Sequence, residues 1–426
     1  MLDLIIHNAR LPDSSQQMSI LVQAGLITEI SPDAICEDLS AHQRIDAKGR
    51  LVSSAFVDAH FHMDSALWYG QPRVNESGTL LEGIAIWRDL KPTLTREEMV
   101  KSATRYCQWA VANGLLAIRS HVDISDPGLI AVEALLEVQQ AVKPWLDLQL
   151  VAFPQDGLLR NPGALQQLIR ALDMGVQVVG GIPHFERTAR EGAQSIQILC
   201  ELAARRGLMV DMHCDETDDP MSRHIETLTF HAQRLGLEGR VTGSHLTSMH
   251  SMDNDYAAKL IDLMAQADIR VVANPLINIT LQGRRDTYPK RRGVTRVPEL
   301  LSAGVTVAFG QDCVMDPWYS LGSGDMLEVA HMGLHVSQMT SQPAMRHCFD
   351  AITQNAAKVL GLQQYGLTPG CHADLLILDA HDPVEAIRLR SNRLAVIRRG
   401  KCISSTPARE AKVQWGNETV SVNWTL

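Results

Sequence analysis

The sequence predicts a (β/α)8, or TIM, barrel that carries a small second domain built from both chain ends. Three observations predict it. Eight short apolar runs alternate with helical stretches through the middle of the chain, polar residues follow these runs, and both chain ends contain short strands of alternating pattern. Strands that alternate with helices are typical of a parallel sheet, and eight of them fit a closed barrel.

The composition is that of a globular enzyme with room for one large domain and one small domain. The chain has 426 residues, of which 45% are hydrophobic and 20% are charged, with a formal net charge of −9. The negative charge and the missing basic patch argue against a nucleic-acid polymer as partner. The sequence contains no secretory signal, no apolar stretch long enough to span a membrane and no Cys-x-x-Cys pair. We therefore expect a cytoplasmic protein that acts on a small molecule.

The two chain ends are predicted to form one small β-sandwich-like domain from residues 1–52 and 366–426. Each end alternates apolar and polar residues and contains a turn, at Ala24-Gly25 and at Arg399-Gly400. These strands can pair only if the intervening chain returns to its starting point. The predicted strands are Leu4–Arg10, Ile20–Ile30, Ala373–Asp379 and Leu394–Ile403.

Residues 53–365 are predicted to form the barrel. The apolar runs are Ser53–Ala59, Leu115–His121, Leu148–Phe153, Val176–Gly180, Leu208–His213, Val241–His245, Arg270–Asn274 and Val305–Gly310. Segments of helical periodicity lie between them, among others Arg96–Asn113, Leu129–Val142, Ala193–Arg206 and Tyr256–Ala267.

Polar residues stand at the end of each run, where a barrel gathers its reacting groups. His60 and His62 leave the same face of a strand, because side chains alternate with a period of two. With His213 and Asp312 at later strand ends, they form a predicted site for one divalent metal that activates water. The full set at the strand ends is His60, His62, His121, Gln155, His184, His213, His245, Asn274 and Asp312.

Several segments carry a resemblance to a known family. Phe56–Asp64 (FVDAHFHMD) resembles the first-strand signature of the amidohydrolase superfamily, and Phe309–Asp312 fits its eighth strand. The match narrows to the bacterial cytosine deaminases of that superfamily. The segments that carry this narrower resemblance are Val151–Gln155, Val210–Glu216, Ala273–Leu276, Asp286–Gly293 and Asp316–Tyr319.

The resemblance implies hydrolytic deamination of a cytosine-type base, in which activated water attacks C4, N3 gains a proton and ammonia leaves. It implies His60, His62, His213 and Asp312 as ligands of a single iron(II) or zinc ion. Residues 178–183 contain no lysine, whereas binuclear relatives use one there to bridge two metals. The resemblance also implies a homo-oligomer.

The same resemblance implies roles for the remaining site residues. Glu216 would carry a proton from water to N3, Asp312 would pass the second proton to ammonia, and His245 would orient the attacking water. An exposed loop acid and a core histidine are the plainer interpretations of Glu216 and His245. Gln155 suits the amide edge of the base, O2 with N1–H. The backbone near Leu80 is a further expected contact, and Trp318 is either a pocket wall or core packing.

Cys313 departs from the family pattern, because the closest type of cytosine deaminase has aspartate after the metal-binding aspartate. A neutral thiol is small and soft, so it would tolerate a methyl group at C5 of the ring better than a carboxylate would. We therefore expect 5-methylcytosine to be accepted and converted to thymine. The alternative is that the cysteine arose by neutral drift and that the enzyme is an ordinary cytosine deaminase.

Three other functions stay open on the sequence. Isoguanine presents a similar amino-amidine edge to the same site. Hydrolysis of a cyclic amide is more distant, because the bridging lysine is missing and Gln155 and Glu216 are present. A non-catalytic scaffold is the alternative from a different class, and the retained ligand set argues against it.

Overall fold

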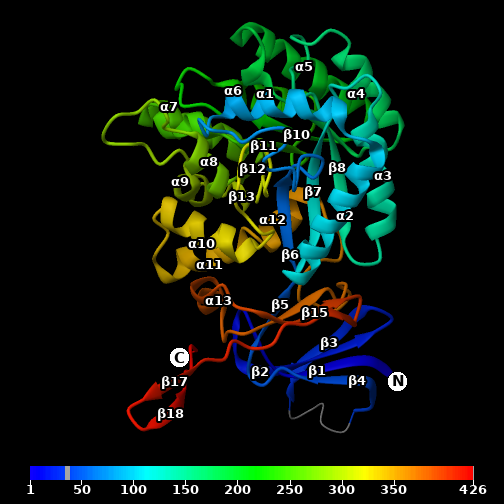
Figure 1. The fold of residues 1–426 in the computed structure, drawn as a ribbon, viewed down its shortest axis with the longest axis vertical. Coiled ribbons are helices and arrows are strands. Elements are labelled where there is room, and N and C mark those ends of the chain that lie inside the picture. Colours follow the sequence, from blue (N-terminus) through cyan, green and yellow to red (C-terminus); the bar gives the residue numbers. More distant parts are fainter. Residues whose placement is uncertain (34–38, 426) are drawn as a thin grey trace.

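Eight parallel strands form the centre of the computed structural model, which describes residues 1–33 and 39–425. They pair in the order β13-β12-β11-β10-β9-β8-β7-β6, so each strand lies beside its neighbour in sequence (Figure 1). The prediction of a (β/α)8 barrel is confirmed. The strands are β6 (Phe56–Phe61), β7 (Leu115–Asp123), β8 (Asp147–Phe153), β9 (Val178–Gly181), β10 (Met209–Cys214), β11 (Val241–His245), β12 (Arg270–Ala273) and β13 (Thr306–Phe309).

The barrel closes between β6 and the residues that follow β13. An isolated parallel bridge joins Phe61 to Asp312. The backbone N–H of Asp312 donates to the carbonyl of His60 over 2.8 Å, and that of His62 donates to the carbonyl of Asp312 over 3.0 Å. The closing hydrogen bonds therefore involve the same residues that the sequence analysis assigned to the metal.

Helices surround the barrel because each has one apolar face to bury. Helix α2 is an example: Thr95 and Glu98 form a capping box at its start, and Met99, Ala103 and Ala110 face the core. The helices are α1 (Leu80–Leu90), α2 (Arg96–Ala112), α3 (Ile130–Val142), α4 (Ala164–Asp173), α5 (Ala189–Arg206), α6 (His224–Arg234), α7 (Asn254–Gln266), α8 (Pro275–Leu281), α9 (Val297–Ser302), α10 (Met326–Val336), α11 (Gln342–Asp350), α12 (Gln354–Leu360) and α13 (Pro383–Leu389).

Strands from both chain ends form a second sheet below the barrel (Figure 1). Its order is β16-β15-β14-β5-β1-β2-β3. Outside this order, β4 pairs in parallel with β1. Apolar residues from its two halves, such as Ile6, Val22, Leu375 and Ile397, share one buried cluster, which gives the sandwich-like packing. The strands are β1 (Leu2–Leu11), β2 (Ser14–Gln23), β3 (Leu26–Pro32), β4 (Ala41–Asp46), β5 (Leu51–Ser54), β14 (Leu375–Leu378), β15 (Arg393–Arg398) and β16 (Lys401–Ser404).

The apolar run Ser53–Ala59 is two strands rather than the single strand predicted. β5 pairs antiparallel with β14, whereas β6 pairs parallel with β7. The chain crosses from one sheet to the other at Ala55, whose N–H donates to the carbonyl of Asp374 over 3.0 Å. Ser53 and Ser54 thus lie in the terminal sheet. The division of the chain at residues 52 and 53 otherwise stays a prediction.

The C-terminal region contains a hairpin that the sequence analysis did not predict. Among the residues that the structure describes, β17 (Lys412–Trp415) and β18 (Glu418–Ser421) pair only with each other, and they project from the body of the molecule (Figure 1). Seven cysteines among the described residues are free, and Cys36 lies outside those residues. Within residues 1–33 and 39–425, no helix is both long and apolar enough to cross a membrane.

Candidate active site

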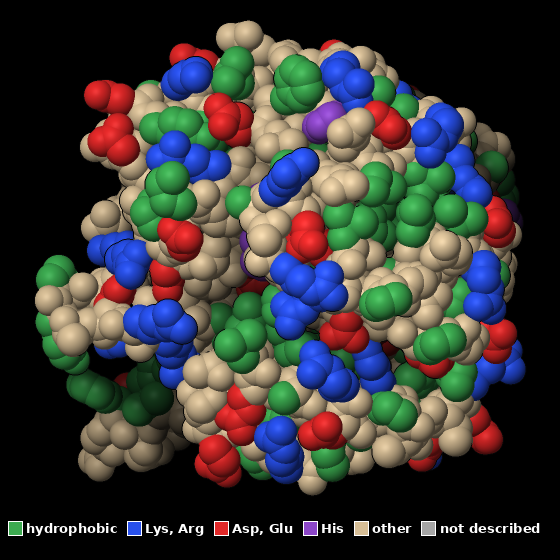
Figure 2. Space-filling view, turned by 90° about the horizontal axis from the view of Figure 1, so that it is seen from above, with side chains coloured by type: hydrophobic (Ala, Val, Ile, Leu, Met, Phe, Trp, Pro, Cys, Tyr) green, Lys and Arg blue, Asp and Glu red, His purple; other side chains and the backbone are tan. Residues whose placement is uncertain are grey.

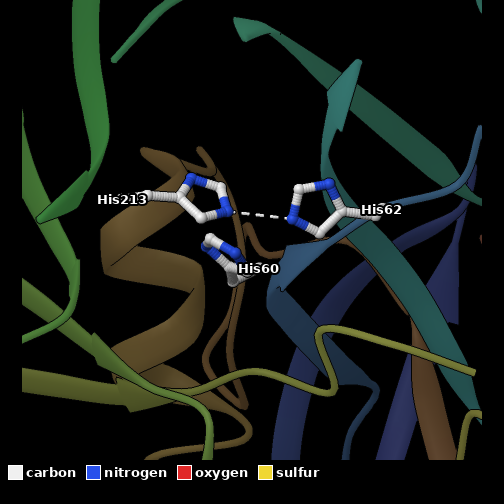
Figure 3. Close-up of side chains that lie close together, drawn as sticks. All are labelled: His60, His62 and His213. Carbon is white, nitrogen blue, oxygen red and sulfur yellow. Dashed lines mark hydrogen bonds between the residues drawn. The ribbon is translucent and has the colours of Figure 1, made fainter. Parts of the chain in front are cut away.

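Three histidines from two strands meet at the upper end of the barrel. His60 and His62 come from the end of β6, and His213 comes from β10 on the opposite side. Their rings point toward one another, with His60 below the other two (Figure 3). The Nε2 atoms of His62 and His213 lie 2.9 Å apart. All three rings can therefore offer a nitrogen to one ion.

Asp312 completes this cluster from the loop after β13. Its Oδ1 lies 3.6 Å from Nε2 of His60 and 3.5 Å from Nε2 of His62. Around a tetrahedral ion with bonds of about 2.0–2.1 Å, the donor atoms would lie about 3.3 Å apart. Neither ring nitrogen of buried His60 has a hydrogen-bond partner among the described residues. His60, His62 and His213 thus form one group that could hold a metal ion, and Asp312 joins His60 and His245 in a second such group.

The electrostatics of the cluster favour a cation. Burial, reinforced by neighbouring histidines, holds the pKa of His60 and His213 well below the ordinary value, and burial lowers the pKa of His62 to about 3. The three rings are thus neutral at physiological pH, the form in which imidazole binds metals. Burial and the nearby Glu216 raise the pKa of Asp312 well above its usual range. A positive charge would favour its ionised form.

Glu216 and His245 face each other beside the cluster. Glu216 follows β10, three residues beyond His213, and its Oε1 lies 3.5 Å from Nδ1 of His245. The same nitrogen is 3.8 Å from Oδ2 of Asp312. Burial raises the pKa of Glu216 to about 8. Glu216 is therefore a buried acid at the site, and the exposed-loop interpretation is wrong.

The backbone at two of these positions adopts a rare conformation. His245 has φ 73° and Asp312 has φ 66°, both in the left-handed region that residues other than glycine seldom occupy. Each such residue costs about 1–3 kcal/mol, and such residues cluster at functional sites. The surrounding contacts therefore have to hold both side chains in place.

A pocket above the cluster contains the remaining predicted residues. Gln155 reaches it from the loop after β8, Leu80 from the start of α1, and Cys313 and Trp318 from the loop after β13. α1 packs closely on Trp318, since Gly83 has no room for a side chain against the indole ring. The pocket is lined by His62, Leu80, Ile84, Gln155, Ile182, His184, Phe185, His213, Glu216, His245, Ile277, Leu281, Asp312, Cys313 and Trp318.

The sequence analysis missed most of the apolar wall. Ile84, Ile182, Phe185, Ile277 and Leu281 stand in helices or loops, and no motif marks them. His184, one of the residues predicted at a strand end and given no role there, lines the pocket. These residues could not be recognised from the sequence, because an apolar residue that lines a pocket looks the same in sequence as one that packs in the hydrophobic core.

Asn278 is a further residue that the sequence analysis missed. Its Oδ1 accepts from the backbone N–H of Asn274 over 3.1 Å, and its Nδ2 lies 3.0 Å from Nδ1 of His245. The backbone bond fixes which end of the amide faces the histidine, so Nδ1 of His245 accepts a hydrogen bond. The spacing of Asn274 and Asn278, four residues apart at a helix start, is the signal that could have found it.

The outer face above the barrel carries charges of both signs. Figure 2 shows basic and acidic side chains interspersed there with apolar ones. A backbone-binding surface for nucleic acid would gather basic side chains on one face. The visible face therefore agrees with a small-molecule substrate.

Comparison with known proteins gives the family. The model of the amidohydrolase family matches residues 43–404. A solved structure of 5-methylcytosine deaminase from Klebsiella pneumoniae, liganded with 5-fluorocytosine, is 42% identical, with a TM-score of 0.94 over 97% of this chain and 100% of that one. Pterin deaminase from Rhizobium rhizogenes (strain K84 / ATCC BAA-868) is 30% identical, covering 90% of this chain and 87% of the relative.

A third relative has a different activity in its name. The N-isopropylammelide isopropyl amidohydrolase of Pseudomonas sp. (strain ADP) is 29% identical over 94% of this chain and 97% of its own length. The family match spans most of the chain, and the resemblance to cytosine-type deaminases is confirmed. The chain therefore belongs to the amidohydrolase family, as a metal-dependent hydrolase that acts on C–N bonds.

Proposed function

We propose that the protein deaminates a cytosine-type base, with 5-methylcytosine as the preferred substrate and thymine and ammonia as products. The observation that carries the proposal is the buried pair Glu216–His245 beside the group His60, His62 and His213, at the floor of an apolar pocket. The similarity in sequence and fold to 5-methylcytosine deaminase supports it. Cytosine, converted to uracil, is the second substrate in this proposal.

The proposed metal ligands are His60, His62, His213 and Asp312. Both iron(II) and zinc suit three imidazoles and a carboxylate. When bound, such an ion lowers the pKa of a coordinated water to about 7 and makes hydroxide available at neutral pH. The neutral rings and the unpartnered nitrogens of His60 support this assignment.

Glu216 is the proposed proton carrier. Because burial raises the pKa of Glu216 to about 8, the carboxyl group holds a proton at neutral pH that it can give to N3 of the ring. Its carboxylate form then takes the proton that water releases. Asp312 would pass the second proton to the departing ammonia, and His245, held by Asn278, would orient the attacking water.

Gln155, Leu80 and Trp318 are the proposed contacts of the base. Gln155 offers both an N–H donor and a carbonyl acceptor, which match O2 and N1–H of the pyrimidine edge. The backbone of Leu80 is the second polar contact. Trp318 supplies a flat apolar wall, and all three residues line the pocket.

Cys313 is the proposed determinant of the preference for the methylated base. The side chain lines the pocket, and burial with the adjacent Asp312 and Asp316 raises the pKa of its thiol well above the usual range. It therefore stays a neutral, soft group rather than a nucleophile. Burying one methyl group against it is worth about 0.8 kcal/mol, whereas placing that methyl against a carboxylate costs more.

An ammonia-release screen tests the function. Cytosine, 5-methylcytosine, isoguanine and dihydroorotate should be assayed with the same metal-loaded enzyme. Ammonia release is measured for the first three compounds, and opening of the ring is measured for dihydroorotate. We expect the highest kcat/KM with 5-methylcytosine. Cytosine ahead by more than tenfold would contradict the preference, and activity on isoguanine or dihydroorotate alone would contradict the proposed substrate class.

Replacing Cys313 by aspartate should move the preference back toward cytosine. The carboxylate would meet the methyl group, so the ratio of kcat/KM for 5-methylcytosine to that for cytosine should fall by about tenfold, equivalent to about 1.4 kcal/mol. Cys313→Ala is the matched control, since it keeps an apolar surface and should retain the ratio. An unchanged ratio in the aspartate variant would remove Cys313 from the proposal.

The pH dependence should report on Glu216. An ordinary glutamate, with a pKa near 4.5, would be ionised throughout the neutral range, whereas Glu216 keeps its proton up to about pH 8. We therefore expect kcat/KM to fall as the pH rises through about 8, because the proton-donating form is lost. Rates measured from pH 6 to pH 10 check this. A profile that stays flat to pH 10 would be inconsistent with Glu216 as the donor.

We also propose a cytoplasmic homo-oligomer, on the resemblance to the family. Light scattering of the purified protein and fractionation of cells that produce it would test both parts.

A further inference from the structure

The seam between β6 and β13 depends on few hydrogen bonds. Neighbouring strands elsewhere in the barrel are joined by ladders, such as the five residue pairs between β10 and β11. Among the described residues, β6 and the loop after β13 are joined by one isolated bridge, Phe61 to Asp312. His60 and Asp312, two proposed ligands, face each other across this seam.

Asp58 reinforces the seam with its side chain. It lies on β6 two residues before His60 and is fully buried. Its Oδ1 accepts from the backbone N–H of Gln311 over 3.0 Å and from that of His60 over 3.2 Å. One carboxylate oxygen thus binds the backbone of His60 on β6 and the backbone of Gln311, the residue before Asp312, in the loop after β13.

The backbone that Asp58 holds is tightly constrained. Asp312 adopts φ 66°, a strained backbone conformation. The turn at residues 311 and 312 keeps this conformation only if surrounding contacts hold it. A Cβ at Gly310 would lie 2.8 Å from Cβ of His60, which shows how closely the two segments approach. A small shift of this turn would move the carboxylate of Asp312 relative to Nε2 of His60.

Asp58 is also costly for the fold. Its Oδ2 has no hydrogen-bond partner within the described part of the chain. A buried carboxylate with an unsatisfied oxygen destabilises the folded state. An apolar side chain at this position would avoid that cost but would leave the N–H groups of His60 and Gln311 without their acceptor, so the use of the carboxylate lies in holding these two amides.

We propose that Asp58 is a positioning residue, which sets the spacing of His60 and Asp312 for the metal through the backbone amides of His60 and Gln311. This inference rests on the proposed metal site. The two hydrogen bonds need only an acceptor oxygen, so the amide side chain introduced by Asp58→Asn can still accept both of them. A side chain without an acceptor would leave both N–H groups unsatisfied.

Metal affinity tests the inference independently of activity. Affinity for zinc should be measured by competition with a chelator in the wild type and in D58N, D58A and D58V, together with Tm. We expect D58A and D58V to bind zinc about 10–100-fold more weakly, which is typical when a group that holds a metal ligand by a hydrogen bond is lost. D58N should stay within about threefold of the wild type, as should the exposed control D262A on α7.

Zinc affinity, rather than Tm, separates positioning from a general structural role. Valine removes the unsatisfied carboxylate oxygen but also the acceptor of two buried N–H groups, so the two effects of D58V on Tm oppose each other, whereas its zinc affinity should fall as in D58A. If D58A does not fold, the zinc affinity of D58V alone tests the inference. Wild-type zinc affinity in D58V, or a loss in D58N as large as in D58A, would overturn the inference. A wild-type protein that binds no metal would instead overturn the proposed metal site.

Discussion

Replacing Glu216 by glutamine should lower kcat for deamination by about 10²–10⁴-fold, the usual contribution of a positioned acid or base. Glutamine keeps the size and the polar character of the side chain but can neither release nor take up a proton at neutral pH. The ring nitrogen would then lack its proton donor. Because the substitution leaves the walls of the pocket in place, KM for the base should change much less than kcat.

A comparison of glutamate variants makes this test specific. Glu238 is exposed after α6, so Glu238→Gln should retain wild-type rates. Single-turnover measurements with 5-methylcytosine and with cytosine would show whether the chemical step has slowed. A Glu216→Gln enzyme within tenfold of the wild-type kcat would show that another group carries the proton.

Removal of the metal should abolish activity, and loss of a ligand should weaken metal binding. Dialysis against a chelator should give an inactive protein that recovers on addition of zinc or iron(II). Loss of a residue that only hydrogen-bonds to a ligand typically weakens metal binding by roughly 10–100-fold. His62→Ala should weaken it by more than this, because the substitution removes one of the four proposed direct donors. Metal content by elemental analysis and activity should fall together.

The control for the ligand variant is a histidine outside the site. His42 is exposed on β4, so His42→Ala should keep both metal and activity. Full activity in a preparation without stoichiometric metal would contradict the proposed chemistry. Stoichiometric metal in His62→Ala would remove His62 from the ligand set.

The barrel could be predicted because its strands and helices follow local patterns. The runs at Val241–His245 and Leu148–Phe153 became β11 and β8 with few changes in their bounds. The run Ser53–Ala59 could not be resolved into two strands, since β5 and β6 are both fully buried and show no alternation. The pairing partners, Asp374 for one sheet and Gly114 for the other, lie far away in sequence.

The site was predictable where a residue type implies chemistry. Histidines and an aspartate at strand ends predicted a ligand cluster, and the structure brings His60, His62 and His213 together, with Asp312 3.6 Å from His60. Their roles stay predictions until the variants are measured. Asn278 and Asp58 could not be assigned, because an asparagine in a helix and an aspartate in a strand have many ordinary uses.

The sequence by itself determined the barrel, the terminal sheet and the identity of the candidate ligands, since periodicity and donor type are written in the order of residues. Only the tertiary structure decided which groups meet. The 3.5 Å approach of Glu216 to His245 and the contact of Asp58 with Gln311 each join a strand to a loop that follows a different strand. Such distances, and the burial that raises the pKa of Glu216, depend on how the barrel closes rather than on any local pattern.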